Sequence, residues 1–327
     1  MHEVRMFHTA SLLTDGKLLV VGGASYAGAE VYDPVTGNWT MTDIMSTTRI
    51  WHTDTVLRNG KVLIIGGQDE SVQSLNTAEL YDPLAMNWTR VPNMRHKRIW
   101  HTATLLKNGK VLVVGGSSDI FNPTNSCELY DPVKNSWTAT SSMHHTRSQH
   151  TTFLLNNGKV LVAGGSSDVD NFNSSELYDP LTGKWTLAAS MNYPRMYHAG
   201  IVLKNGKVLI AGGWEYNYGE LDSAELFDPS TGVWTLTGNK NQQRDSPTIS
   251  LLNDGKVLVA GADLSSLYSS SSTELYDPLT GNWTNTPNMN YPRTTNTQTT
   301  LKNGKVLVAG GCGNGYDFYN SAELYTP

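Results

Sequence analysis

The chain has 327 residues, a formal net charge of −5 and 16% charged residues. It therefore lacks the basic field that nucleic acid or an anionic membrane surface would need, and we expect neither partner. The apolar runs are short, such as Val111 to Val114, and stay far below the roughly 20 residues of a membrane-spanning helix. Cys127 and Cys312 lie at non-equivalent places and indicate free thiols rather than a disulfide framework.

One unit recurs seven times along the chain. The shared pattern is an Arg, a His-Thr-rich run, an Asx-Gly pair, a Lys-Val-Leu-Val-like run, Gly-Gly, a variable loop, Glu-Leu-Tyr-Asp-Pro and Trp-Thr. Single positions vary among the copies, copy six has Gly-Ala in place of Gly-Gly, and copy seven lacks Trp-Thr. The lead arginines, spaced by 44 to 49 residues, are Arg5, Arg49, Arg98, Arg147, Arg195, Arg244 and Arg293. A period of this length is typical of propeller blades, each of which needs its neighbours to bury a core.

In chain order, each unit predicts four antiparallel strands. The Asx-Gly pair favours a type I′ turn that joins the first two β-prone runs as a hairpin. Pro and Gly in segments such as YDPVTGNW predict a turn before an outer strand that begins at Trp. Strand one is rich in small Thr, Ala and Ser, which fit near a crowded axis, and Trp fits the wide end of a wedge. We therefore predict an all-β, seven-bladed propeller of four-stranded antiparallel blades.

The predicted propeller is a single domain, residues 1–327. Its blades are 1–45, 46–94, 95–143, 144–191, 192–240, 241–289 and 290–327. The seventh copy stops at Ala322-Glu323-Leu324-Tyr325-Thr326-Pro327, before any Trp, and Met1 precedes Arg5 as Met45 precedes Arg49. Blade seven should lack its outer strand, so we expect a monomer with an exposed edge there. A fragment of a longer protein would show this pattern.

The Gly-Gly doublet, the Tyr of Glu-Leu-Tyr-Asp-Pro and the spaced Trp together resemble the kelch repeat, over essentially all 327 residues. This resemblance implies a kelch-type propeller of the galactose oxidase superfamily. Such propellers include protein-binding adaptors, sugar-binding modules and copper oxidases, so function has to be sought where the blades differ.

Two repeated residue types predict structural roles. The seven arginines are matched by seven glutamates of the third strand, which predicts a buried Arg-carboxylate pair in every blade. A His occupies one position in five consecutive blades, at His8, His52, His101, His150 and His198. These rings either bond backbone groups between blades or surround the central channel and bind a metal ion there, with His101, His150 and His198 as ligands. We expect no other cofactor.

The residue before that His varies among blades, and so do the loops after Gly-Gly. In a four-stranded meander these loops open on the same face as the junctions from strand four to the next strand one. Aromatic rings and carboxylates should therefore gather around one mouth, which suits a glycan or a peptide with basic residues. The residues that we expect to bind the ligand are Trp51, Trp100, Tyr197, Trp214, Glu215, Tyr216, Asp69, Asp119 and Asp168.

Blade five offers an enzymatic alternative. Its RMYH at 195–198 and Gly-Gly-Trp at 212–214 resemble elements of galactose oxidase and other copper radical oxidases. The resemblance implies that Tyr197 and His198 ligate copper and that Trp214 covers the site. The second tyrosine of that family is missing from the equivalent positions, Phe7, Trp51, Trp100 and Gln149. We therefore favour a non-catalytic module that binds a glycan or a peptide, without catalytic residues, over a metal-dependent oxidase-like enzyme; a scaffold with no ligand site is the third interpretation.

Overall fold

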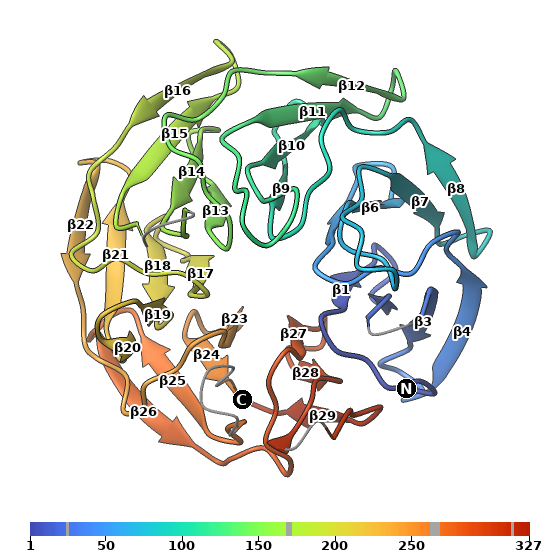
Figure 1. Ribbon diagram of the computed structural model, residues 1–327. Coiled ribbons are helices and arrows are strands. Elements are labelled where there is room, and N and C mark those ends of the chain that lie inside the picture. Colours follow the sequence, from blue (N-terminus) through green and yellow to red (C-terminus); the bar gives the residue numbers. More distant parts are fainter. Residues whose placement is uncertain (24–25, 168–171, 262–268, 315–316) are drawn as a thin grey trace.

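Seven antiparallel sheets are arranged as blades around a central axis (Figure 1). The structure is a computed structural model and describes residues 1–23, 26–167, 172–261, 269–314 and 317–327. Six sheets have four strands in sequence order, and the seventh has three. The predicted seven-bladed propeller with an incomplete last blade is therefore confirmed.

Within each blade the strands follow one another in chain order from the axis to the rim (Figure 1). Blades one to three contain β1 (Thr9–Leu12), β2 (Leu18–Val21), β3 (Gly28–Tyr32), β4 (Trp39–Ile44), β5 (Thr53–Val56), β6 (Val62–Ile65), β7 (Ala78–Asp82), β8 (Asn87–Val91), β9 (Thr102–Leu105), β10 (Val111–Val114), β11 (Cys127–Asp131) and β12 (Ser136–Ala139). Blades four and five contain β13 (Thr151–Leu154), β14 (Val160–Ala163), β15 (Ser175–Asp179), β16 (Lys184–Leu187), β17 (Ala199–Val202), β18 (Val208–Ala211), β21 (Ala224–Asp228) and β22 (Val233–Leu236). Blades six and seven contain β23 (Thr248–Leu251), β24 (Val257–Ala260), β25 (Thr273–Asp277), β26 (Asn282–Thr286), β27 (Thr297–Thr300), β28 (Val306–Ala309) and β29 (Ala322–Tyr325). A short hairpin, β19 (Trp214–Glu215) and β20 (Gly219–Glu220), lies in the blade-five loop and was not predicted.

The repeated turn residues set these hairpins. In blade two, Gly60 has a φ of 82° and donates its amide to the Leu57 carbonyl at 2.9 Å, which reverses the chain between β5 and β6. At the other end of the blade, Asp82 accepts the amide of Leu84 at 3.0 Å and starts the turn into β8. The register then places Tyr81 opposite Trp88, with ring centroids 5.0 Å apart.

The hydrophobic cores lie between blades, not within them. The second strand of every blade is fully buried, for example Val111–Val114. Leu63 and Ile65 of blade two pack with Val113 and Tyr130 of blade three in one cluster. Each blade is therefore stabilised by both neighbours, as in other repeat proteins.

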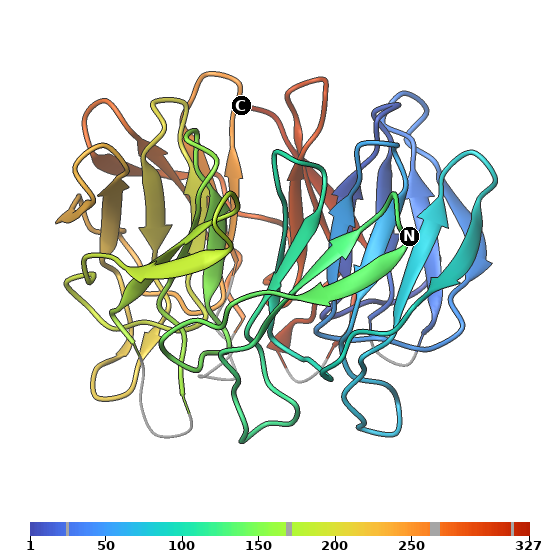
Figure 2. The same ribbon diagram turned by 90° about the horizontal axis from the view of Figure 1, so that it is seen from above.

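The two faces of the ring differ. Figure 2 shows long loops extending from one face, the lower in this view, and short turns on the other. The long loops join strands two and three and follow the Gly-Gly pairs; we call this the Gly-Gly face. Within the described residues there is no helix long and apolar enough to cross a bilayer.

The variable residue and the following His precede the innermost strand of each blade. In blade two, β5 starts at Thr53, after both Trp51 and His52. Trp51 has a φ of 55°, in the left-handed region, because the chain bends sharply there before it enters the strand.

Candidate functional site

The Gly-Gly pair builds the rim of the Gly-Gly face. Gly67 donates its amide to the carbonyl of Arg98 in the next blade at 2.8 Å. A side chain at the preceding Gly66 would place its Cβ 2.7 Å from that same carbonyl oxygen, and its φ is 59°. The doublet is therefore required for close contact between blades, and it is a structural feature of the repeat.

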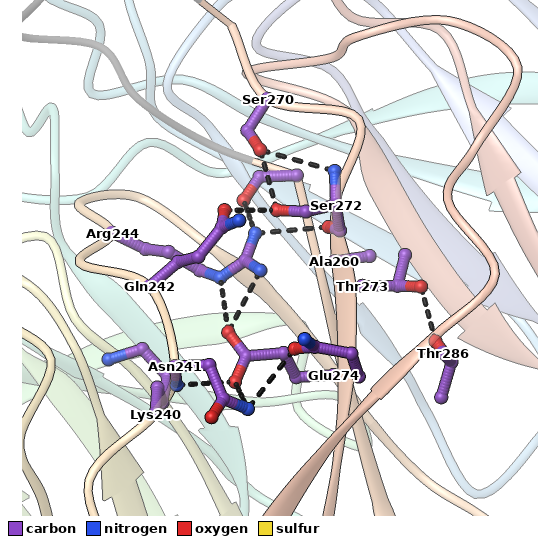
Figure 3. Close-up of polar contacts among 12 residues, drawn as sticks. Lys240, Asn241, Gln242, Arg244, Ala260, Ser270, Ser272, Thr273, Glu274 and Thr286 are labelled. Atoms are coloured by element: carbon purple, nitrogen blue, oxygen red, sulfur yellow. Dashed lines mark hydrogen bonds and ion pairs between the residues drawn. The ribbon is translucent and has the colours of Figure 1, made fainter.

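The arginines of the repeat are equally structural. Figure 3 shows the pair in blade six, where Arg244 donates to Glu274 Oε1 at 3.0 Å and to the carbonyls of Gly261 and Ser272 at 2.9 and 3.0 Å. The other oxygen of Glu274 accepts the amide of Asn241 at 2.7 Å. Equivalent pairs in all seven blades have separations of 2.9 to 3.1 Å, so the predicted Arg-carboxylate pairs are confirmed. These arginines are buried and are not presented to a ligand.

The histidines link neighbouring blades. Nε2 of His101, His150 and His198 lies 2.9, 3.1 and 2.7 Å from the hydroxyl of a Thr in the preceding blade. Burial lowers the pKa of His101 and of His198 to about 3, so both rings are neutral at physiological pH. Among the described residues, no three His, Cys, Asp or Glu side chains are grouped so that they could hold a metal ion. Each ring thus has a structural partner, and metal binding by these histidines stays a prediction.

Seven residues with left-handed backbone form a ring at the inner edge of the Gly-Gly face. Their φ values lie between 47° and 57°, and they are Phe7, Trp51, Trp100, Gln149, Tyr197, Ser246 and Thr295. Neighbouring members are joined through the backbone, as where Ser246 donates its amide to the Tyr197 carbonyl at 2.7 Å and Gln149 to that of Trp100 at 3.1 Å. We call this set the mouth ring. Its backbone conformation is common to all blades, whereas its side chains differ, so the conformation belongs to the fold and the side chains can determine what it binds.

The mouth ring has an aromatic arc and a polar arc. The Trp51 ring contacts Phe7 at a centroid distance of 5.3 Å and Trp100 at 5.0 Å, with tilts of 61° and 49°. On the polar side, Gln149 donates to the Tyr197 hydroxyl at 2.6 Å. All five side chains are partly exposed. The structure therefore brings the predicted residues Trp51 and Trp100 together and adds Phe7, and it places Tyr197 in the opposite arc with Gln149.

The predicted loop residues have more local roles. Asp69 accepts the amides of Ser71 and Gln73 at 3.0 and 2.9 Å, and Asp119 accepts those of Phe121 and Asn122 at 2.8 and 3.0 Å. The amide of Phe121 holds the pKa of the Asp119 carboxyl below its usual value.

Glu215 is buried and accepts the amides of Asn217 and Tyr218 at 2.9 and 2.7 Å. These carboxylates thus stabilise their own loops. Trp214 and the exposed Tyr216 form an edge-to-face pair at 5.9 Å. Asp168 lies outside the described residues.

A carboxylate in the central channel was missed by the sequence reasoning. The innermost strands line a cavity of about 290 Å³, whose wall includes Thr53, Asp54, Thr102 and Thr151. Asp54 accepts a hydrogen bond from Ser11 at 2.6 Å, and burial raises the pKa of its carboxyl. It is the one charged residue in the seven innermost strands. Comparison of the repeats at that position would have identified it.

A family model confirms the nature of the repeat. The model described as the KLHDC2/KLHL20/DRC7 Kelch-repeats domain matches residues 51–261 and 100–311, which together cover most of the chain. The chain belongs to this kelch-repeat family. Kelch propellers are a fold used in binding modules, and typically bind proteins. A search of curated proteins found no match.

Among solved structures, the kelch chain is similar to a fungal alcohol oxidase of the AA5 family, in complex with copper. The TM-score is 0.81 at 20% identity, over 99% of this chain and 74% of the oxidase. At that identity the match shows a shared fold. The residues that resemble the copper ligands have separate partners here, because Tyr197 accepts from Gln149 while His198 contacts Thr151. Burial also raises the pKa of Tyr197 to about 12.

Proposed function

We propose that this protein is a non-catalytic binding module that recognises an extended peptide segment of a partner protein at the mouth ring. The aromatic arc of Phe7, Trp51 and Trp100 supplies an apolar anchor site. The Tyr197 hydroxyl accepts a hydrogen bond from Gln149 and can donate its own O–H to a carbonyl of the peptide backbone. Aromatic side chains commonly carry most of the binding energy of such sites. The observation that carries this proposal is the cluster of three partly exposed aromatic rings beside the polar arc of the mouth ring.

Two features favour a peptide over a glycan. Neighbouring rings of the aromatic arc are tilted by 49° and 61° to one another, so they present edges and a wedge rather than one flat surface for a sugar ring. The surrounding loops also present exposed apolar side chains, Val72, Phe121 and Tyr216. The carboxylates that a sugar would need for its hydroxyl groups are engaged within their own loops at Asp69, Asp119 and Glu215.

The test is a selection of peptides from a random display library against the whole chain, followed by affinity measurements with variants. We expect peptides that share an apolar residue, and we expect Trp51→Gly to weaken them at least tenfold. Glycine suits the left-handed backbone at this position, so this variant should remain folded. Trp137→Phe is the matched control, because Trp137 lies on the outer strand β12, and it should bind normally.

Two results would overturn the proposal. One is a set of selected peptides that bind Trp51→Gly and the unchanged protein equally well. The other is a parallel glycan array that yields ligands dependent on Trp51, with no peptide selected, since this would make the mouth a sugar site.

A further inference from the structure

The innermost strands carry one charged side chain, and it lies just inside the mouth ring. Asp54 is the second residue of β5, three residues after Trp51, and it lines the channel cavity of about 290 Å³. β5 leads from the Gly-Gly face to the short turn at Gly60 on the opposite face, so its first residues are the ones nearest the mouth. A ligand at the mouth ring can therefore reach the Asp54 carboxylate through the channel.

The blades differ at this position, as they do in the mouth ring. The equivalents of Asp54, each two residues after the His position, are Ala10, Ala103, Thr152, Gly200, Ile249 and Gln298. The neighbours in blades one and three are both Ala, which leaves space beside the carboxylate, and Ala103 and Gly200 line the same cavity. A carboxylate in one blade of seven is not required by the repeat, so its role is to be sought in what enters the channel.

Within the described part of the chain, the partners of the Asp54 carboxylate are neutral. Burial raises the pKa of this carboxyl, and the groups that oppose the effect are the hydroxyls of Ser11 and Thr9 and a backbone amide. His52, which lines the same cavity, is neutral because burial lowers its pKa to about 3. The ion pairs of the described residues do not include Asp54. A carboxylate that is removed from water without a cation is costly, and a cationic ligand would offset this cost.

Hydroxyl groups accompany the carboxylate in the wall of the cavity. Thr53, Thr102 and Thr151 line it, and each hydroxyl lies 2.7 to 3.1 Å from the Nε2 of a His in the next blade. A hydroxyl oxygen has two lone pairs, so each of these oxygens keeps at least one for an N–H group of a ligand. The wall thus offers a carboxylate and several acceptors, which is the set that an ammonium or guanidinium group needs.

The approach to the channel is acidic. The seven loops between strands two and three contain no Lys or Arg, and their carboxylates in the described residues are Asp69, Glu70, Asp119, Glu215, Glu220, Asp222 and Asp317. The exposed Lys and Arg residues of the junctions lie in one of them, at Arg95 and Lys97. On the opposite face, by contrast, a Lys directly follows every Asx-Gly pair. The field of the Gly-Gly face therefore favours a basic ligand.

We infer that the peptide bound at the mouth ring inserts one Lys or Arg side chain into the channel, where its cationic group pairs with Asp54. This inference rests on the proposed function and adds to it the chemical class of a second anchor residue. An apolar residue of the peptide contacts the aromatic arc, and the basic side chain passes Trp51 and donates its N–H groups to the carboxylate and to the Thr hydroxyls. Hydrogen bonds between charged partners are the strong ones, so this pair contributes affinity as well as specificity.

The test uses three peptide display libraries whose central residue is fixed as Lys, Arg or Met, with Lys and Arg left out of the random positions. We expect the Lys or the Arg library to be enriched over the Met library on the unchanged protein. Asp54→Asn should weaken the selected peptides at least tenfold, because it removes the charge and keeps the shape of the side chain.

The matched control is Asp254→Asn. It removes the same charge from an Asx-Gly turn on the opposite face, where five other blades hold Asn-Gly, and it should bind normally. A second measurement follows the carboxyl carbon of Asp54 by NMR; bound peptide should shift its titration to lower pH, since a nearby cation favours the charged carboxylate.

The outcomes separate this inference from the proposed function. Peptides that bind Asp54→Asn and the unchanged protein equally well, but lose affinity for Trp51→Gly, would overturn the role of Asp54 and leave the mouth ring as the binding site. Enrichment of the Met library alone, or an Asp54 titration that the peptide does not change, would also overturn it. If no library yields a peptide, both proposals are wrong.

Discussion

Replacement of Lys240 by Met should stabilise the protein in a pH-dependent way. Lys240 (Figure 3) stands four residues before the lead arginine Arg244, at the junction between two blades. Five other junctions hold Met at this position, and Lys240 is only 3% exposed. Its Nζ donates to the Leu221 carbonyl at 2.9 Å. A Cβ at Gly212 would lie 3.1 Å from that Nζ, much as one at Gly115 would lie 3.1 Å from the Cε of Met143. The lysine nitrogen thus occupies the place of a methionine methyl group.

Burial, with smaller contributions from Arg195 and Arg244, lowers the pKa of Lys240 from 10.5 to about 7. The unfolded chain therefore binds one more proton than the folded chain between these two pH values. The free energy of unfolding therefore rises as pH increases from 7 to 10.5. As pH falls through the same window, the buried Lys240 increasingly destabilises the folded protein. The full shift corresponds to roughly 5 kcal/mol of destabilisation at pH values below both pKa values.

Lys240→Met removes this cost without leaving a new unpaired group. The Leu221 carbonyl still accepts the Arg244 amide at 3.2 Å, and Met has nearly the same length as Lys. Relative to the unchanged protein, we expect the free energy of unfolding of the variant to increase most near pH 6 and little near pH 10. The increase at pH 6 should exceed that at pH 10 by about 4 kcal/mol.

The assay is urea unfolding of both proteins at the two pH values, with fluorescence and circular dichroism compared to verify a two-state transition. Met191→Lys is the reciprocal variant; it should introduce the same pH dependence at the junction of blades four and five. An equal stabilisation by Lys240→Met at both pH values would refute the reasoning, because it would show that the lysine is protonated in the folded protein.

Three further predictions concern the shared features of the blades. Trp51→Gly should be more stable than Trp51→Ala by about 1 kcal/mol in urea unfolding, because only glycine adopts the left-handed backbone without cost; the opposite order would contradict the ring conformation. Glu128→Gln should cost about 3 to 5 kcal/mol by leaving a buried arginine unpaired, and Glu323→Gln at the open edge should cost less than half as much in the same assay. Acid should unfold the protein as pH falls from 6.5 toward 3, because in this range the histidines become protonated in the unfolded chain while the buried imidazoles of the folded protein stay neutral. A circular dichroism titration without a transition over this range would contradict this prediction. The histidines whose pKa burial lowers to about 3 are His8, His52, His101 and His198.

The sequence predicted the repeat architecture because each element is encoded locally. Asn59-Gly60 sets a tight turn from two residues, and the opposition of Tyr81 and Trp88 follows from the length of the turn between them. The pairing of Arg244 with Glu274 was also predictable, because seven equal copies at fixed spacing leave few alternatives. The mouth ring was found only in part: Trp51 and Trp100 were expected at the mouth, whereas their left-handed backbone was not.

The sequence by itself therefore determined the number of blades, the order of strands, the incomplete seventh blade and the face on which the variable loops lie. Only the tertiary structure decided which side chains meet across blades. Phe7, Trp51 and Trp100 are more than 40 residues apart in sequence and touch because the ring closes. The structure likewise placed the Asp69 and Asp119 carboxylates within their own turns, because nearby backbone amides satisfy them at little entropic cost. A repeat pattern specifies contacts within one unit, and the contacts between units depend on the curvature with which the units pack.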